Sequence, residues 1–475
     1  MKPLITSLAV ALTLGGCSMI PEYEAPESPV PAVIGSADTA TGELALPDWQ
    51  SLFTDPQLKA LVEQALDNNR DLELALLDVK EAQALYGIER SGLYPEISAS
   101  ADGTRQRLPA DLSSTGSSNV SGQYSVGLGV AAYELDLFGR VRSLSESALE
   151  TYLGTEEAVR STRITLISEV ANAYLTLLSD RQKLKISEET VASQQSSVDL
   201  VQRRYDAGLS AELSVRQAEI ALESARANRA QFRQQVSQDL NALSVLVGGP
   251  VPELGESNVI DPAIAFLADV PESLDASVLT LRPDIRQAEH TLKAANANIG
   301  AARAAFFPSI TLTGSAGTAS SDLSGLFEGG SGAWSFAPSV NIPIFNAGRL
   351  RANLDVAEIR TEKSVVSYEK TVQTAFQEVA DALAARSYLK EQEDAQAALV
   401  KAAERSLTLA EVRYENGADD YLAVLDARRE LLTARQSLVE VKRLKLTNRI
   451  TLYRSLGGGE KAPQTSPEEP SASST

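Results

Sequence analysis

The chain has 475 residues, a formal net charge of −20 at pH 7, one histidine and one cysteine. So few His and Cys residues exclude a His/Cys metal site within one chain, and no metal or cofactor is expected. The acidic balance argues against nucleic acid as a partner, and a single cysteine leaves no disulfide within the chain.

The N-terminus is typical of a lipoprotein signal peptide. An apolar run from Leu4 to Leu14 is too short to cross a bilayer, and it leads into Leu14-Gly15-Gly16-Cys17. That sequence is typical of a lipobox, in which removal of residues 1–16 leaves Cys17 to carry lipid. Ser18 follows, instead of the aspartate that retains many lipoproteins at the inner membrane, so the outer membrane is the expected location. A chance cysteine after an ordinary signal peptide is the alternative.

Most of the chain consists of two copies of one structural repeat. Arg204-Tyr205-x-x-Gly208 recurs as Arg413-Tyr414-x-x-Gly417 at an offset of 209 residues. Nearer the N-terminus, the best alignment pairs Pro95 with Pro308 at an offset of 213. The second copy is therefore slightly shorter after its proline, and a loop between Pro95 and Leu137 is expected to absorb the difference.

These alignments divide the chain into segments. Residues 17–47 are expected to be a lipid-anchored linker, residues 48–250 the first structural repeat and residues 251–456 the second. The last residues, 457–475, are rich in Pro, Ser and Glu, and such a composition predicts a disordered tail.

Alternation of apolar with small or polar residues predicts one strand hairpin in each repeat, over about 94–137 and 306–345. The clearest apolar rows are Tyr124, Val126, Leu128, Val130 and Ala132, and Trp334, Phe336, Pro338, Val340, Ile342 and Ile344. Rows of about ten residues suit tilted transmembrane strands, although a soluble hairpin on a core gives the same pattern. Four strands cannot close into a membrane barrel and lipid forbids an open edge, so three chains are expected to share one twelve-stranded barrel.

Long helices are expected where proline is absent, between Pro109 and Pro250 and between Pro343 and Pro463. A helix from about Arg142 to Arg204 would be roughly 95 Å long, which suits a spacer or the wall of a tube. Its apolar residues recur every seven positions, a spacing that indicates left-handed supercoiling; they are Val170, Leu177, Leu184, Val191, Val198 and Tyr205.

Each long helix is expected to turn back on itself. Gly208 can end the first one in a left-handed conformation, and a return helix is predicted from about Ala211 to Val247. Each repeat therefore contains an antiparallel helical hairpin, and Arg-Tyr-x-x-Gly marks its tip.

Several short motifs occur in an order and spacing that resemble one protein family. They are Pro21-x-Tyr23-x-x-Pro26 after the lipobox, Asp48-Trp49-x-x-Leu52-Phe53, Leu281-Arg282-Pro283-Asp284 and Leu425-Asp426-Ala427-Arg428-Arg429. Together with the two hairpin tips, they make the chain similar to the outer membrane factor family, the TolC-like exit ducts of tripartite efflux and secretion systems. The lipobox and Gly248-Gly249-Pro250 resemble the lipoprotein branch that serves resistance-nodulation-division drug pumps.

The resemblance implies a mixed α+β membrane protein that is not an enzyme. It implies a homotrimer with a twelve-stranded outer-membrane β-barrel and a periplasmic α-barrel made from the long antiparallel helical hairpins. The implied partners are a periplasmic adaptor (membrane fusion) protein, an inner-membrane pump and outer-membrane lipid. The implied role is passive conduction from pump and adaptor to the exterior, and the resemblance does not identify the cargo.

Carried over position by position, the resemblance implies a periplasmic gate at Leu422, Asp426 and Arg429. Spacings of four and three residues put these side chains on one helix face, so a symmetric trimer would present rings of each toward its axis. Asp419 and Asp420 would add negative charge near the mouth. The same pattern fits an ordinary surface pair of Asp426 with Arg429, worth roughly a few tenths of a kcal/mol.

The hairpin tips are the implied contacts for the adaptor. The candidates are Arg204, Tyr205, Gly208, Arg413, Tyr414 and Gly417. The glycine and tyrosine residues fit a role in the turn and its packing equally well.

Two other classes of function are alternatives to a duct. A lipid-anchored coiled-coil spacer without a pore explains the heptads and the lipobox but not the four alternating strands. A carboxylate enzyme using Asp419, Asp420 and Asp426 lacks any nucleophile, oxyanion hole or metal site beside these residues.

Overall fold

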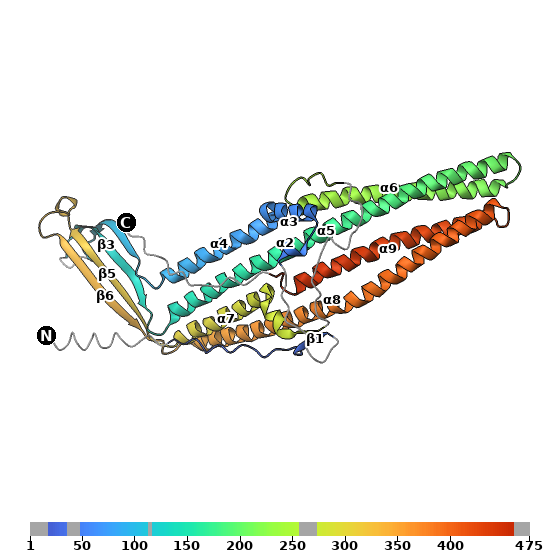
Figure 1. Ribbon diagram of the computed structural model, residues 1–475. Coiled ribbons are helices and arrows are strands. Elements are labelled where there is room, and N and C mark those ends of the chain that lie inside the picture. The colour runs from blue at the N-terminus through green and yellow to red at the C-terminus, as the bar shows by residue number, and fades with distance from the viewer. Residues whose placement is uncertain (1–17, 36–47, 113–115, 256–272, 460–475) are drawn as a thin grey trace. The chain divides into compact units, whose positions relative to one another are not determined.

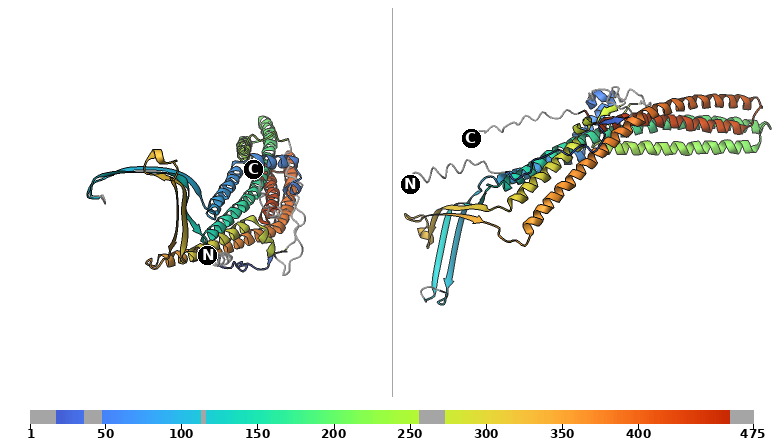
Figure 2. Two further views of the ribbon diagram at one scale, coloured as in Figure 1. Left: turned by 90° about the vertical axis from the view of Figure 1, so that its left-hand side faces the viewer. Right: turned by 90° about the horizontal axis from the view of Figure 1, so that it is seen from below.

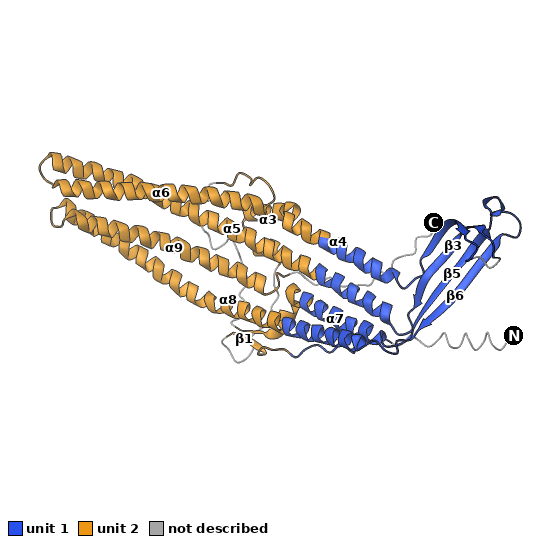
Figure 3. Ribbon diagram, turned by 180° about the vertical axis from the view of Figure 1, so that it is seen from behind, with its two compact units in different colours: residues 1–27, 78–156, 287–368 blue, residues 28–77, 157–286, 369–475 orange. Residues whose placement is uncertain are grey.

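A computed structural model describes residues 18–35, 48–112, 116–255 and 273–459 (Figure 1). The predicted signal peptide, Cys17, part of the predicted linker and the tail from residue 460 lie outside these residues. The chain divides into two compact units, and each draws segments from both repeats (Figure 3). Unit 1 comprises residues 1–27, 78–156 and 287–368, and unit 2 comprises residues 28–77, 157–286 and 369–475.

Unit 1 contains a four-stranded antiparallel sheet, which is curved (Figure 2). Its strands, in spatial order, are β2 (Ile97–Leu108), β3 (Asn119–Leu135), β5 (Ser309–Ser320) and β6 (Gly332–Asn341). The two predicted hairpins therefore exist, and β3 pairs with β5 to join them. Within the part of the chain that the structure describes, β2 and β6 are the edge strands.

Helical segments complete unit 1. They come from α4 (Arg70–Ser91), α5 (Arg140–Asp206), α7 (Pro283–Ala304) and α8 (Arg349–Glu415), with the short η3 (Leu323–Gly325) between β5 and β6. The N-terminal segment lies on α7, because Asn296 Nδ2 donates to the Pro21 carbonyl at 2.9 Å. A Cβ on Gly300 would lie 2.6 Å from Ile20 Cγ1, so only glycine permits this close approach.

Unit 2 is mostly helical. Besides the remaining parts of α4, α5 and α8, it contains β1 (Val33–Gly35), α2 (Trp49–Leu52), α3 (Pro56–Asn68), α6 (Glu212–Leu246), β4 (Ser273–Asp275), η2 (Ala276–Leu281) and α9 (Tyr421–Ser455). Strand β1 pairs antiparallel with β4, so part of the predicted linker has a fixed place in this unit. Among the described residues, no helix is both long enough and apolar enough to cross a membrane.

The core of unit 2 explains the Asp48-Trp49 motif. Trp49, Leu52 and Phe53 are buried against the heptad face of α5. Tyr174 Oη donates to Asp55 Oδ2 at 2.8 Å, and Asp55 also accepts from the Gln57 N–H at the start of α3. Burial and this hydrogen bond raise the pKa of Tyr174 well above its usual range.

The predicted repeat is confirmed by the helices. The bounds of α8 and α9 are those of α5 and α6 shifted by 209 residues, and those of α7 are those of α4 shifted by 213. The expectation that a loop absorbs the length difference is wrong. The difference lies in β3, which has 17 residues against 10 in β6, while the connection from β3 to α5 (136–139) is three residues shorter than that from β6 to α8 (342–348). Strand β3 also changes register between Val130 and Tyr133, where Ala132 adopts a φ of 54°.

Candidate functional site

The two hairpin tips share one turn geometry. Gly208 and Gly417 have φ values of 71° and 73°, and the chain leaves each α-helix through them. The Leu209 N–H donates to the Arg204 carbonyl, and the Ala418 N–H donates to the Arg413 carbonyl, each at 2.8 Å. A Cβ on either glycine would meet nothing within 4 Å, so the turn requires glycine for its backbone conformation and not for packing.

The second tip carries charges that the first lacks. Arg413 donates to both carboxylate oxygens of Asp419, at 2.6 and 2.9 Å, and this contact lowers the pKa of Asp419. Asp420 Oδ1 accepts from the Ala423 N–H and caps α9. The aligned residues of the first tip are Ser210 and Ala211, and α6 has no side-chain cap.

An aromatic cluster packs below the tips, where α5, α6, α8 and α9 meet. Its buried members are Val201, Val215, Ala218, Tyr414, Tyr421 and Val424. The Tyr414 and Tyr421 rings lie 5.3 Å apart, and the Arg204 guanidinium lies 4.8 Å above the Tyr414 ring. Two of the predicted adaptor contacts, Arg204 and Tyr414, therefore touch each other, whereas Tyr205 is exposed.

The three predicted gate residues share the exposed face of α9. Leu422 is exposed, and the side chains of Asp426 and Arg429 are 53% and 78% exposed. Arg429 Nη2 donates to Asp426 Oδ1 at 2.7 Å. Tyr421 and Val424 lie on the opposite, buried face of the same helix.

A largely buried arginine beside the predicted gate residues was not predicted. The Arg428 side chain is only 14% exposed. Its Nη1 donates to Ser197 Oγ and, at 3.4 Å, to Gln194 Oε1, both on α5, while its Nη2 donates to Glu411 Oε1 on α8 at 2.7 Å. The helical spacing from Tyr421 and Val424 was the only available signal, since a charged residue ordinarily indicates an exposed position.

No part of this site resembles a metal centre. Among the residues that the structure describes, no group of three or more His, Cys, Asp or Glu side chains is arranged to hold a metal ion. The tips offer charged side chains, apolar and aromatic side chains, close contacts between helices and hydrogen bonds.

Comparison with known proteins decides the family. The family model for outer membrane efflux proteins matches residues 61–249 and 276–458, which together contain both repeats and both tips. The chain belongs to the outer membrane efflux protein family. The resemblance seen in its motifs is thereby confirmed, and with it the mixed α+β fold of TolC-like channels.

The relatives match over nearly their whole length. The antibiotic efflux pump outer membrane protein ArpC of Pseudomonas putida is 49% identical over 468 residues, covering 96% of each chain. The toluene efflux pump outer membrane protein TtgC of Pseudomonas putida is 48% identical with the same coverage. The open-state MtrE outer membrane channel of Neisseria gonorrhoeae has a TM-score of 0.83 and 40% identity, covering 93% of this chain and 98% of that one.

Family membership establishes the role and the location. This efflux protein is an exit duct of the Gram-negative outer membrane, and it extends into the periplasm. The predicted role as an exit duct and the predicted outer-membrane location are thus confirmed.

Proposed function

We propose that this efflux protein conducts as a homotrimer whose periplasmic gate consists of Leu422, Asp426 and Arg429 from each protomer. In the closed duct, a ring of leucine side chains narrows the path, and Asp426 and Arg429 hold neighbouring protomers together. Cys17 carries the lipid anchor, and the protein acts as a passive duct and not as an enzyme. The role of a poreless spacer is set aside, because it gives the four-stranded sheet no purpose.

The exposure of the gate residues supports this proposal most directly. An apolar residue and two oppositely charged residues share a face of α9 that nothing within the described chain covers, while the opposite face is buried. In one chain, the exposed Asp426–Arg429 pair is worth only about 0.3–0.5 kcal/mol. A gate made of these residues therefore needs pairs between protomers, where two charges approach in a narrower and less hydrated space.

The proposal also includes negative charge near the periplasmic mouth of the duct. Asp420 caps α9 and keeps its carboxylate near the start of that helix, so the mouth carries negative charge beside the gate. Asp419 is neutralised by Arg413 within the chain. The asymmetry between the tips, with these charges only in the second, supports the second hairpin as the one that lines the gate.

Contacts between the hairpins are proposed to hold the gate closed. Arg428 connects α9 to α5, and Arg204 of α5 lies over Tyr414 of α8. A movement of the second hairpin away from the first breaks both contacts. We propose that a periplasmic adaptor favours this movement by binding the two tips, at Arg204, Tyr205, Gly208, Arg413, Tyr414 and Gly417.

The cargo and the other partners follow from the relatives. Those compared above are named for the efflux of antibiotics and of toluene, so we propose antibiotics and aromatic solvents as the cargo class. An inner-membrane pump selects the cargo and the adaptor couples pump to duct.

Single-channel conductance in a planar bilayer tests the gate. The variant Leu422→Ser/Asp426→Ala/Arg429→Ser is expected to turn a small or flickering wild-type current into a large and steady one. The matched control is Leu213→Ser/Gln217→Ala/Ile220→Ser, which changes the aligned positions of the first hairpin and is expected to leave the current as it is. Equal conductance of all three proteins would refute the gate, and absence of any current would favour the spacer.

A further inference from the structure

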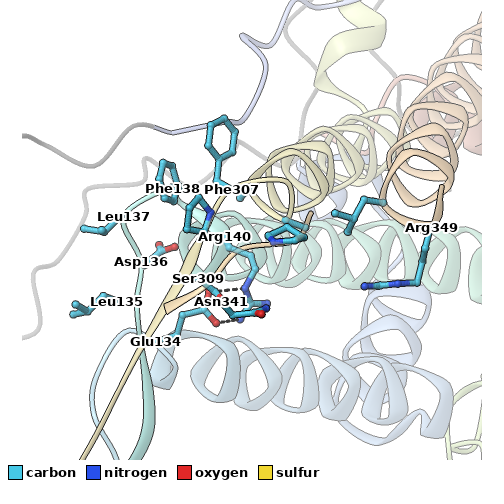
Figure 4. A pocket seen from close by; sticks show the side chains of 15 residues that line it. Glu134, Leu135, Asp136, Leu137, Phe138, Arg140, Phe307, Ser309, Asn341 and Arg349 are labelled. Carbon is cyan, nitrogen blue, oxygen red and sulfur yellow. Dashed lines mark hydrogen bonds and ion pairs between the residues drawn. The ribbon is translucent and has the colours of Figure 1, made fainter. Parts of the chain in front are cut away.

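Unit 1 contains a cavity of about 260 Å³ where the strands meet the helices (Figure 4). The ends of β3 and β6, the start of β5, the starts of α5 and α8 and the end of α7 line it. The stacked rings of Phe138 and Phe307, with centroids 4.7 Å apart, lie at one side, and polar groups of Glu134, Ser309 and Asn341 lie at another. The cavity therefore combines apolar walls with a few charged groups, as sites for small ligands do.

The first repeat contributes charges that are already satisfied. Arg140 donates to both oxygens of the Glu134 carboxylate, at 2.8 and 2.6 Å. Asp136 accepts from the Val141 and Arg142 N–H groups at the start of α5 and pairs with the Arg142 guanidinium. Neither carboxylate is left without a cation, and neither arginine is left without a carboxylate.

The second repeat contributes a cation without its carboxylate. Arg349 aligns with Arg140 at the repeat offset, but the residue that aligns with Glu134 is Pro343. Among the described residues, no carboxylate forms an ion pair with Arg349, whereas Arg351, two residues further on, pairs with Asp355 at 3.0 Å. Arg349 thus lines the cavity from the start of α8 as a guanidinium without a carboxylate partner among the described residues (Figure 4).

The segment that leads to Arg349 is apolar and exposed. Ile344 is 93% exposed and continues the exposed apolar row of β6, which includes Trp334 and Phe336, and the adjacent Phe345 is 89% exposed. Side chains of this kind at the end of a membrane strand are stable when acyl chains or lipid headgroups surround them. An uncompensated cation and an apolar row within one segment fit a ligand with an anionic head and an apolar tail.

We propose that Arg349 and this cavity bind the phosphate of an anionic phospholipid at the periplasmic face of the outer membrane. The guanidinium of arginine binds a phosphate through two parallel hydrogen bonds, which a lysine or a neutral side chain does not reproduce. The acyl chains then lie along the apolar row that ends at Ile344, beside Phe345. The proposal rests on the outer-membrane location, and it is independent of the gate.

Native mass spectrometry of the full-length, lipidated protein in detergent tests the site. The probes are phosphatidylglycerol, zwitterionic phosphatidylcholine and inorganic phosphate. Wild-type protein is expected to retain phosphatidylglycerol in preference to phosphatidylcholine, and Arg349→Gln is expected to weaken phosphatidylglycerol binding about five-fold, the effect of one basic residue near a lipid surface. The matched control, Arg351→Gln, removes a paired arginine from the same turn and is expected to leave lipid binding unchanged.

A second variant tests the charge balance without removing the arginine. Pro343→Glu supplies the carboxylate that the first repeat has at Glu134, and it is expected to weaken phosphatidylglycerol binding as much as Arg349→Gln does. Equal losses in Arg349→Gln and Arg351→Gln would overturn the proposal, because they would reflect overall charge alone. Displacement of phosphatidylglycerol by an excess of inorganic phosphate would overturn the lipid as the ligand and assign the site to a soluble anion.

Discussion

Replacing Arg428 with methionine is expected to open the duct while leaving it folded. The Arg428 side chain is 14% exposed and contacts α5 and α8, so its replacement removes contacts between helices and not contacts with solvent. The contact with Glu411 lies within the second hairpin, since α8 and α9 form that hairpin, and it moves with the hairpin when the gate opens. Only the contacts with Gln194 and Ser197 on α5 favour the closed state.

The size of the effect follows from these two contacts. A hydrogen bond to a charged group contributes roughly 1.5–3 kcal/mol, and the longer one to Gln194 contributes little. About 2 kcal/mol is therefore removed from the closed state, which raises the ratio of open to closed channels roughly thirty-fold. Methionine keeps the length and apolar stem of the side chain, so the packing around Tyr421 is largely retained.

Open probability in single-channel recordings measures this ratio, and thermal unfolding checks that the variant is folded. The matched control is Arg435→Met, because Arg435 pairs with Glu404 at 2.8 Å and this ion pair connects α9 to α8, within the same hairpin. The control is expected to leave the open probability unchanged. An Arg428→Met channel that opens no more often than wild type, or a control that opens equally often, would refute the reasoning.

Two further predictions concern stability. Burial and the neighbouring Asp180 raise the pKa of Asp239 to about 6, with Lys183 opposing the shift, so the folded state loses stability as the pH rises from about 4 to 6. After allowance for solvent screening, Asp239→Asn is expected to raise the free energy of unfolding by about 1 kcal/mol above pH 6 and to leave it unchanged below pH 4. Equal changes in the free energy of unfolding at both pH values, measured by denaturant unfolding, would contradict this. Gly417→Ala is expected to lower the free energy of unfolding by about 1 kcal/mol, because the φ of 73° at this position is unfavourable for alanine even though a Cβ there meets nothing within 4 Å. Gly87→Ala, in the middle of α4 and equally free of contacts, is expected to stabilise the protein instead, and melting temperatures that shift in the same direction for both would count against the backbone argument.

The sequence predicted the helices almost to the residue, for a physical reason. The first long helix was expected from about Arg142 to Arg204 and spans Arg140–Asp206, because the absence of proline and a glycine turn define both of its limits. The strands were also found, but the extra residues of the first hairpin lie in a bulged β3 and not in a loop. Alternation of residue types does not reveal a bulge, because a bulge changes the register of only a short stretch.

The site was predicted less completely than the fold. Leu422, Asp426 and Arg429 share one exposed face as expected, since helical spacing alone determines that. The burial of Arg428 was not foreseen, because it depends on partners on α5 and α8 that lie far away in the sequence. Spacing identifies residues of one helix that share a face, but it does not identify what packs against that face.

Differences between the two repeats locate function better than their similarities do. Positions that both copies keep, such as Gly208 and Gly417, meet a backbone requirement that is the same in each hairpin. Charged positions diverge instead: Gln217 and Ile220 of the first copy correspond to Asp426 and Arg429 of the second. In an oligomer of identical chains, the two copies of the repeat have different surroundings. Selection therefore acts on them separately only at positions where a copy contacts something other than the other copy. We therefore expect the unmatched charges of the second copy to lie on the surfaces through which the chain contacts neighbouring protomers and cargo.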